Sequence, residues 1–364
     1  MTPDRADTHR WAREEREGRL VLFGFASLVG IEPRPLPELL RAASAHGFDT
    51  VELNVGPTFA PIAGASFPGH LDLQDVVATE GAPVRELLTE HGMSICALAP
   101  MLNALTGDLP LRQERIATLQ LTIEACAVLG VPTLVTYGGA VSGMYLWGLP
   151  GVGDGHRTNM VDANLAAFRE VYGPLAQYAA ERGVRIAFET APRGGGEGNI
   201  AHAPELWDRL FDAVESDALG LSFDPSHLHW LGIPDPPALI RAYRDRIYNV
   251  DGKDAEVLPE RLARQGILGN AWWRYRLPGL GGLDWRAILS TLREIGYEGA
   301  LTIENEDPMY LGLAGAAWSA NYLRGCVPPP MPAGDQPHAA RPPVLSAATD
   351  AEASSPSPGR NQTP

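Results

Sequence analysis

Cysteine is scarce in this chain, and long apolar runs are missing from it. Cys96, Cys126 and Cys326 stand far apart without C-x-x-C spacing, which argues against a disulfide framework or a thiolate zinc site. No apolar run approaches the roughly 18 residues of a membrane-spanning helix. Residues 1–19 alternate acids with arginines, where a signal peptide would be apolar. We therefore expect a soluble, cytoplasmic protein.

Positive charge is also in short supply. The chain carries 44 acidic and 29 basic side chains, a formal net charge of -15, and no segment concentrates the basic ones. Such a surface repels a phosphate backbone, so we expect no nucleic-acid partner and no membrane partner. Lysine occurs once, at Lys253. A lysine is a compact charge whose pKa can move, whereas arginine is a planar fork that stays charged, so a site can require one of them. Lys253 is therefore a candidate functional residue, unless it survives by chance.

Composition divides the chain into three segments. Residues 20–326 hold enough apolar material for one large core, in a chain that is 45% hydrophobic. Residues 327–364 are rich in proline, alanine and serine and show no apolar period, which is typical of disorder. We predict a solvated arm over 1–19, one domain over 20–326 and a disordered tail over 327–364.

Short apolar or β-branched runs alternate with longer segments of helical period throughout the domain. Several of the helical segments end in a glycine turn before the next strand, as in HGFDTVEL and LGVPTLVT. Eight such βα units predict an α/β fold of the (β/α)8 TIM barrel type. A doubly wound sheet is the alternative, but no glycine-rich phosphate loop follows the first two strands. The eight predicted strands are 21–27, 50–53, 95–99, 133–137, 184–189, 219–224, 247–250 and 300–303.

Carboxylates follow four successive strands at the end where a TIM barrel has its active site. Glu189 ends the fifth strand, Asp224 the sixth, Asp251 follows the seventh and Glu304 the eighth. Each one alone could be a helix cap, a turn residue or a surface salt bridge. Together at one barrel mouth they would repel one another unless protons or a cation neutralised them. We therefore predict a divalent metal, and the oxygen ligands favour Mn²⁺ or Mg²⁺ while leaving Co²⁺ and Zn²⁺ open. Glu52, at the end of the second strand, is a candidate for binding a substrate hydroxyl or for a structural hydrogen bond.

The segments AFETAP, SFDPSH, VDGKD and TIENEDP, in this order on the last four strands, resemble the xylose isomerase-like TIM barrel superfamily of sugar phosphate isomerases and epimerases. The resemblance extends over about residues 20–323. It implies that Glu189 and Glu304 are metal ligands that also face the substrate, and that Asp224 is a ligand. It further implies that His227 contacts substrate oxygens or the metal.

One position departs from the family pattern. The seventh strand of the family usually reads His-x-Lys-Asp with the histidine as a ligand, and here Asp251 takes that place. Asp251 either ligates as a harder donor, which favours Mn²⁺ or Mg²⁺, or leaves the site one ligand short. The superfamily also contains endonuclease IV, but the histidine-rich metal cluster of that enzyme is missing here and the charge is wrong for DNA.

The chemistry that fits these residues is proton abstraction next to a carbonyl, with a metal stabilising the enediolate. Glu189 and Glu304 are the candidate bases, and His227 and Lys253 would hold or protonate substrate oxygens. The predicted function is isomerisation or epimerisation of a sugar, keto-sugar or polyol. A lyase or dehydratase acting on an inosose or a 3-keto-glycoside shares the first step and remains an alternative. A third possibility is a catalytically degenerate barrel that binds a carbohydrate without transforming it.

Aromatic residues precede the eighth unit in the stretch WWRYR. Trp273 and Arg276 are candidates for binding the substrate, because aromatic faces stack on sugar rings and arginine can clasp a hydroxyl or a phosphate. The same aromatics could instead form the interface of a homo-oligomer. No phosphate nest is evident, which favours an unphosphorylated substrate.

Overall fold

The computed structural model describes residues 22–27, 30–60, 65–141, 154–194, 197–267, 269 and 271–327. The chain divides into two compact units, Met1–Pro328 and Pro329–Pro364, and all described residues belong to the first. The predicted arm over 1–19, and the predicted tail apart from Val327, lie outside the described residues.

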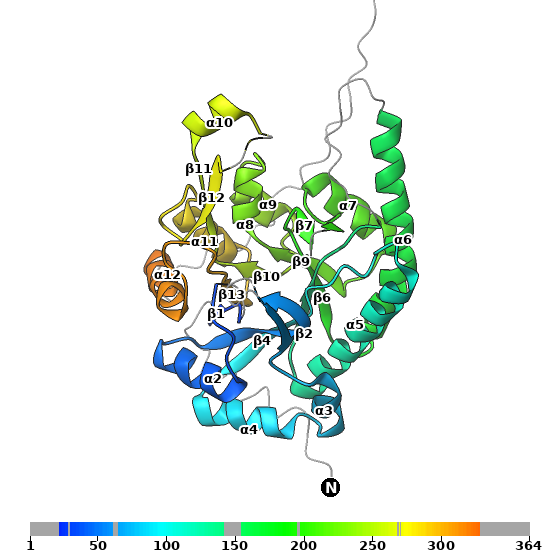
Figure 1. The fold of residues 1–364 in the computed structure, drawn as a ribbon, viewed down its shortest axis with the longest axis vertical. Coiled ribbons are helices and arrows are strands. Elements are labelled where there is room, and N and C mark those ends of the chain that lie inside the picture. Colours follow the sequence, from blue (N-terminus) through cyan, green and yellow to red (C-terminus); the bar gives the residue numbers. More distant parts are fainter. Residues whose placement is uncertain are drawn as a thin grey trace, which may run out of the picture. The chain divides into compact units, whose positions relative to one another are not determined.

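A barrel of parallel strands forms the centre of the fold (Figure 1). The main sheet has nine strands in the order β1-β13-β10-β9-β6-β5-β4-β2-β3, and all of them except β3 run parallel to their neighbours. A parallel bridge between Ala26 and Glu52 brings β1 to β2 and closes the ring. The TIM barrel is thereby confirmed. Its eight strands are β1 (Leu22–Phe25), β2 (Thr50–Ala60), β4 (Ser94–Ala99), β5 (Thr133–Thr136), β6 (Arg185–Glu189), β9 (Leu219–Phe223), β10 (Ile247–Asp251) and β13 (Ala300–Ile303).

Helices follow the strands and surround the barrel (Figure 1). Their ends carry the expected caps: the Asp108 carboxylate accepts a hydrogen bond from the Leu111 amide at the start of α5, and Gly130 closes that helix with a positive φ of 72°. The long helices are α2 (Leu36–Ala45), α4 (Ala82–His91), α5 (Leu109–Leu129), α6 (Asp154–Ala180), α7 (Pro204–Ala213), α11 (Trp285–Glu294) and α12 (Leu313–Cys326), with the shorter α9 (Pro236–Ala242).

Several elements were not predicted from the sequence. Strand β3 (Ala65–Gly69) forms an antiparallel hairpin with β2. A second hairpin, β11 (Asp254–Val257) with β12 (Trp273–Arg276), follows β10 and carries α10 (Pro259–Gln265) between its strands. Figure 1 shows this hairpin and α10 extending beyond the barrel. The remaining elements are α3 (Leu73–Ala78), α8 (Pro225–Trp230), and the short pair β7 (Arg193–Gly194) and β8 (Glu197–Gly198).

The apolar core lies between the barrel strands and the helices. Strands β5, β9 and β13 are buried along their whole length, which explains why they read as continuous apolar runs. None of the helices in the described parts of the chain combines the length and apolarity needed to cross a membrane.

Candidate metal and substrate site

The barrel strands bring five carboxylates together, four of them from strand ends and Glu52 from near the start of β2, not from its end as the sequence had indicated. Glu52, Glu189, Asp224, Asp251 and Glu304 come from β2, β6, β9, β10 and β13 or the residues directly after them. Each of the five is at most 9% exposed. Carboxylates are almost never buried to this extent unless they are paired, protonated or bound to a metal.

The four predicted metal ligands fall into two overlapping groups. Oxygens of Glu189 and Asp224 and a ring nitrogen of His227 lie within 4.8 Å of one another, and so do oxygens of Glu189, Asp251 and Glu304. Glu189 belongs to both groups. The structure therefore places this side chain at the centre of the cluster.

Asp224 is oriented by the short helix that follows it. Its Oδ1 accepts a hydrogen bond of 2.7 Å from the Ser226 amide at the start of α8, an N-cap that Pro225 at the first helical position reinforces. Its Oδ2 points toward Lys253 Nζ at 2.8 Å and His227 Nε2 at 3.1 Å. One carboxylate thus begins a helix and also faces the site.

Lys253 is 1% exposed and joins the two groups of ligands. Its ammonium contacts Glu304 Oε2 and lies 2.9 Å from Glu306 Oε1 and 3.2 Å from His227 Nε2. The compact ammonium of a lysine can donate to several acceptors in this space, whereas the planar guanidinium of an arginine has a different shape. A Cβ at the neighbouring Gly252 would lie 2.8 Å from Ile303 Cδ1, so a side chain there would displace the end of that isoleucine.

Asp251 is held by polar neighbours at the end of β10. Ser222 Oγ donates a hydrogen bond of 2.8 Å to its Oδ2. Asn249 Nδ2 donates to Glu52 Oε2 at 3.1 Å and lies 3.4 Å from Asp251 Oδ1. Glu52, predicted to contact substrate, is thus engaged in a hydrogen bond with Asn249.

Burial raises the pKa of four carboxylates in the cluster. The pKa values of Glu189 and Asp251 are well above their ordinary range because the side chains are desolvated and then because other carboxylates surround them. Burial raises the pKa of Glu52 to about 8 and that of Glu304 to about 7. These groups therefore bind protons more readily than solvent-exposed carboxylates do, and a cation can take the place of the protons.

Asp224, His227 and Lys253 behave differently. Burial opposes ionisation of Asp224, but Lys253 and then His227 lower its pKa below the usual value. Burial, with Lys253 nearby, lowers the pKa of His227 to about 4, so the imidazole is neutral at pH 7. Burial also opposes the charge on Lys253, but Asp224 and Glu304 hold its pKa well above the ordinary value.

These residues fit a divalent cation. Glu189 Oε1 is buried and has no hydrogen-bond partner among the residues that the structure describes. An unpartnered carboxylate oxygen in this setting is costly unless it binds a proton or a cation. The surrounding donors are carboxylate oxygens and one neutral imidazole nitrogen, a set suited to hard or borderline divalent metals.

Aromatic side chains of the β11–β12 hairpin cover one side of the cluster. The indole of Trp273 stacks on Trp230 with ring centroids 4.2 Å apart. Tyr275 Oη lies 3.0 Å from His227 Nδ1. Arg276 Nε lies 3.4 Å from Asp307 Oδ2. Of the two predicted substrate-binding residues on this hairpin, Trp273 is therefore engaged with another indole and Arg276 with a carboxylate.

Several residues near the cluster were missed by the sequence reasoning. Ser222 and Asn249 lie on buried strands and read as ordinary strand positions. Tyr275 is the tyrosine of the stretch WWRYR, and the sequence indicates only its aromatic character. Tyr137, directly after β5, has its pKa raised by burial and then by the charges of Glu189 and Glu304, which places its phenol near them. Its position at a strand end was the available clue.

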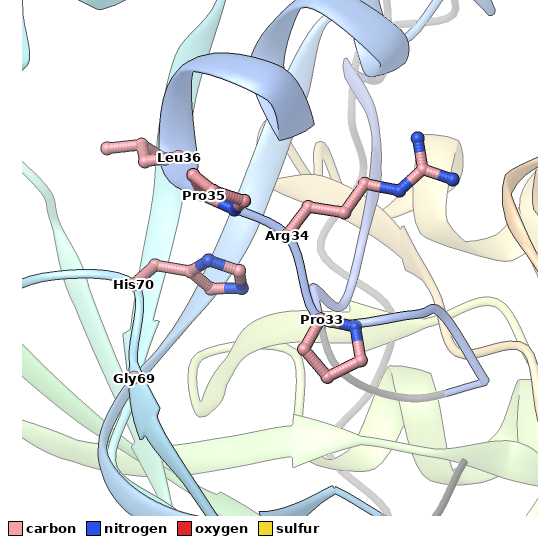
Figure 2. A pocket seen from close by; sticks show the side chains of 6 residues that line it. All are labelled: Pro33, Arg34, Pro35, Leu36, Gly69 and His70. Atoms are coloured by element: carbon pink, nitrogen blue, oxygen red, sulfur yellow. The ribbon is translucent and has the colours of Figure 1, made fainter. Parts of the chain in front are cut away.

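A pocket of about 250 Å³ lies apart from these residues. It is lined by Pro33, Arg34, Pro35, Leu36, Gly69 and His70. Figure 2 shows the His70 ring facing the Pro33–Pro35 segment, whereas the Arg34 side chain extends away from it. None of the lining residues belongs to the carboxylate cluster.

Comparison with known proteins gives one family and several relatives. A family model described as xylose isomerase-like TIM barrel matches residues 40–326. The uncharacterized protein YfiH of Bacillus subtilis is 28% identical over 318 residues, covering 80% of this chain and 94% of YfiH. The rhizopine catabolism protein MocC of Rhizobium meliloti is 37% identical over 148 residues, 38% of this chain and 43% of MocC. An inosose dehydratase of Clostridium botulinum is 31% identical over 142 residues, 37% of this chain and 45% of the dehydratase.

Solved structures share the fold at low sequence identity. A D-tagatose 3-epimerase-like protein superimposes with a TM-score of 0.61 at 19% identity, covering 84% of this chain and 97% of that one. The IolI protein with a bound zinc atom superimposes with a TM-score of 0.59 at 22% identity, covering 84% of this chain and 96% of IolI.

Proposed function

Because the chain belongs to the xylose isomerase-like TIM barrel family, we propose that it is a divalent-metal-dependent isomerase or epimerase of an unphosphorylated sugar, keto-sugar or polyol. The observation that carries the proposal is the buried Oε1 of Glu189, which has no hydrogen-bond partner among the described residues, on a side chain that offers a ligand atom to both groups. The likeness of the fold to a D-tagatose 3-epimerase-like protein supports the reaction class, and the zinc atom bound by the IolI protein supports the metal.

Glu189, Asp224, Asp251 and Glu304 would hold the metal. When bound, a divalent cation would act as a Lewis acid that offsets the negative charge developing on the substrate oxygens. The predominance of carboxylate donors, with Asp251 in place of histidine, favours Mn²⁺, with Mg²⁺, Co²⁺ or Zn²⁺ as further candidates.

Glu189 and Glu304 are the proposed proton carriers. Their oxygens approach within 4.8 Å of each other, so both can reach a carbon held beside them. One carboxylate removes the proton next to the carbonyl. The other carboxylate, or the same one, returns a proton to that carbon or to its neighbour. Burial raises the pKa of Glu304 to about 7, which suits a group that must gain and lose a proton near neutral pH, and it raises the pKa of Glu189 above its ordinary range.

Lys253 and His227 would hold the substrate oxygens. The Lys253 ammonium can donate to a carbonyl or hydroxyl oxygen, and the His227 Nε2 faces the same space as Asp224. Trp273 and Glu52 remain proposed substrate contacts at the edges of this space, and Arg276 would reach it only on leaving Asp307.

An unphosphorylated substrate is favoured by the charge of the site. The cluster gathers Glu52, Glu189, Asp224, Asp251 and Glu304 around the single ammonium of Lys253. A phosphate group on the substrate would bring two further negative charges close to these carboxylates.

The likeness to inosose dehydratase favours a second candidate, elimination of a group β to a ketone. This candidate begins with the same proton abstraction.

Metal content and proton exchange test the proposal together. We expect about one Mn²⁺ or similar ion per chain by elemental mass spectrometry, and its loss in Glu189→Ala and Asp251→Ala. The metal-loaded protein should exchange a C–H proton of a keto-sugar or inosose with deuterium from the solvent. A product of unchanged mass indicates isomerisation, and a loss of water or of an aglycone indicates the lyase. No metal after loading with Mn²⁺, Mg²⁺ and Co²⁺ would favour a degenerate carbohydrate-binding barrel.

A further inference from the structure

Tyr275 touches both candidate oxygen-binding residues. Its hydroxyl lies 3.0 Å from His227 Nδ1, and the two rings are perpendicular at a centroid distance of 5.5 Å. The ammonium of Lys253 lies 4.7 Å from the centroid of the Tyr275 ring, within the range of a cation–π contact. Tyr275 is therefore placed to fix the orientation of His227.

The hairpin that carries Tyr275 is anchored on the helix that carries His227. Trp273, two residues before Tyr275 on β12, stacks on Trp230 at an interplanar angle of 2°. Trp230 ends α8, the six-residue helix that contains His227. The phenol and the imidazole thus belong to two elements that are packed together, so the distance between them is fixed by more than one contact.

The neighbours of Nε2 indicate which ring nitrogen carries the hydrogen. In a neutral imidazole one ring nitrogen carries the hydrogen and the other accepts. Lys253 Nζ has only hydrogens to offer and lies 3.2 Å from Nε2. An Nε2–H directed at Asp224 would also face this ammonium. A lone pair on Nε2 instead accepts from Lys253, and a cation could bind Nε2 only by taking the place of that hydrogen bond.

We infer that Tyr275 is a positioning residue whose hydroxyl oxygen accepts a hydrogen bond from Nδ1–H of His227 and thereby holds the Nε2 lone pair toward the carboxylate cluster. Its link to catalysis rests on the function proposed above, whereas the tautomer itself does not. The hydrogen bond made by one ring nitrogen sets the state of the other, and loss of such a partner typically costs about 10–100-fold in metal affinity or activity.

The test measures the tautomer directly. Protein labelled with ¹⁵N-histidine, metal-free at pH 7.5, is examined by long-range ¹H–¹⁵N NMR, with His227→Gln to assign the resonance. Tyr275→Phe removes the hydroxyl and keeps the ring over Lys253. Tyr243→Phe is the matched control, because it removes a hydroxyl that bonds to Asp208 Oδ1 at 2.7 Å, away from the cluster. Mn²⁺ affinity is measured by calorimetry on the same three proteins.

In the wild type and in Tyr243→Phe we expect a protonated Nδ1 and an unprotonated Nε2. In Tyr275→Phe both ¹⁵N shifts should move toward a mixture of tautomers, with Mn²⁺ binding weaker by about tenfold. A protonated Nε2 in the wild type, or unchanged shifts in Tyr275→Phe, would overturn the inference. Changed shifts with unchanged Mn²⁺ affinity would support positioning and assign His227 to the substrate. Failure of the wild type to exchange substrate protons would reject the proposed function and leave the tautomer result intact.

Discussion

Asp251 stands where the resemblance to the xylose isomerase-like family implies a histidine ligand. Ser222 and Asn249 hold its carboxylate toward Glu189 and Glu304, so an oxygen donor is built into the end of β10. Imidazole is a softer ligand than carboxylate, and ligand type contributes to metal selectivity. We predict that Asp251→His shifts the preference from Mn²⁺ toward Zn²⁺ by about tenfold, equivalent to about 1.4 kcal/mol.

Competition calorimetry with Mn²⁺ and Zn²⁺ measures this preference. Asp251→Asn is the control, because it keeps the shape and an oxygen donor while removing the charge. It should weaken binding of both metals and leave their ratio near that of the wild type. An unchanged ratio in Asp251→His would show that Asp251 does not ligate the metal.

The residues of the cluster were predictable, whereas their partners were not. Glu189, Asp224, Asp251 and Glu304 follow apolar strands, and parallel strands in a barrel deliver their ends to one mouth. Lys253 drew attention as the only lysine, but its contacts with Asp224 and Glu304 depend on packing between strands far apart in sequence. Ser222 and Asn249 carry no strand-end pattern: Asn249 lies two residues before Asp251 on β10, and the pairing of β9 with β10 brings Ser222 to Asp251.

Among the elements, the loop between the β11–β12 hairpin and α11 depends on one buried carboxylate. Asp254 is fully buried and accepts hydrogen bonds from the amides of Gly279 and Leu283 and from the indole nitrogen of Trp285. Loss of this carboxylate would leave the buried indole nitrogen of Trp285 unpaired, at a cost of about 1–3 kcal/mol, and would also remove the partner of the part-buried amides of Gly279 and Leu283. We predict that Asp254→Ala lowers the free energy of unfolding by about 3–5 kcal/mol.

Urea unfolding of Asp254→Ala beside Asp284→Ala checks this prediction. Asp284, on the same loop, is exposed and caps α11 through the Ala287 amide at 3.0 Å. Its loss should cost about 1 kcal/mol. Equal losses in the two variants would contradict the central role given to Asp254.

The elements themselves show where sequence periodicity is informative. All eight barrel strands were predicted, and the glycines expected to end helices before a strand have positive φ: Gly47, Gly92, Gly130, Gly183 and Gly296. The β11–β12 hairpin was not predicted, because its two strands are separated by α10 and pair only across that insertion. A local pattern contains no information about a partner so distant in sequence.

At the scale of the whole molecule, the barrel closes where β1 meets β2, and a partly buried histidine lies close to this closure. The His70 amide donates to the carbonyl of Asn54 on β2 at 3.1 Å, and its ring faces the segment that leads from β1 to α2 (Figure 2). Burial lowers the pKa of His70 from 6.5 to about 4. Ionisation of this one side chain is therefore coupled to the stability of the closed barrel.

The sign of the effect follows from the two pKa values. Between about pH 4 and 6.5 the unfolded chain binds a proton at His70 and the folded chain does not, so acid favours unfolding in this window. We predict that His70 alone lowers the free energy of unfolding by roughly 2–3 kcal/mol as the pH falls from 7 to 4.

Urea unfolding in EDTA at several pH values measures this loss of stability. His70→Phe should lose less stability over this window than the wild type, because both share the carboxylate cluster and differ in one imidazole. His46→Gln, which removes an exposed imidazole, is the matched control. A His70→Phe profile parallel to that of the wild type would mean that His70 takes up its proton without opening the barrel.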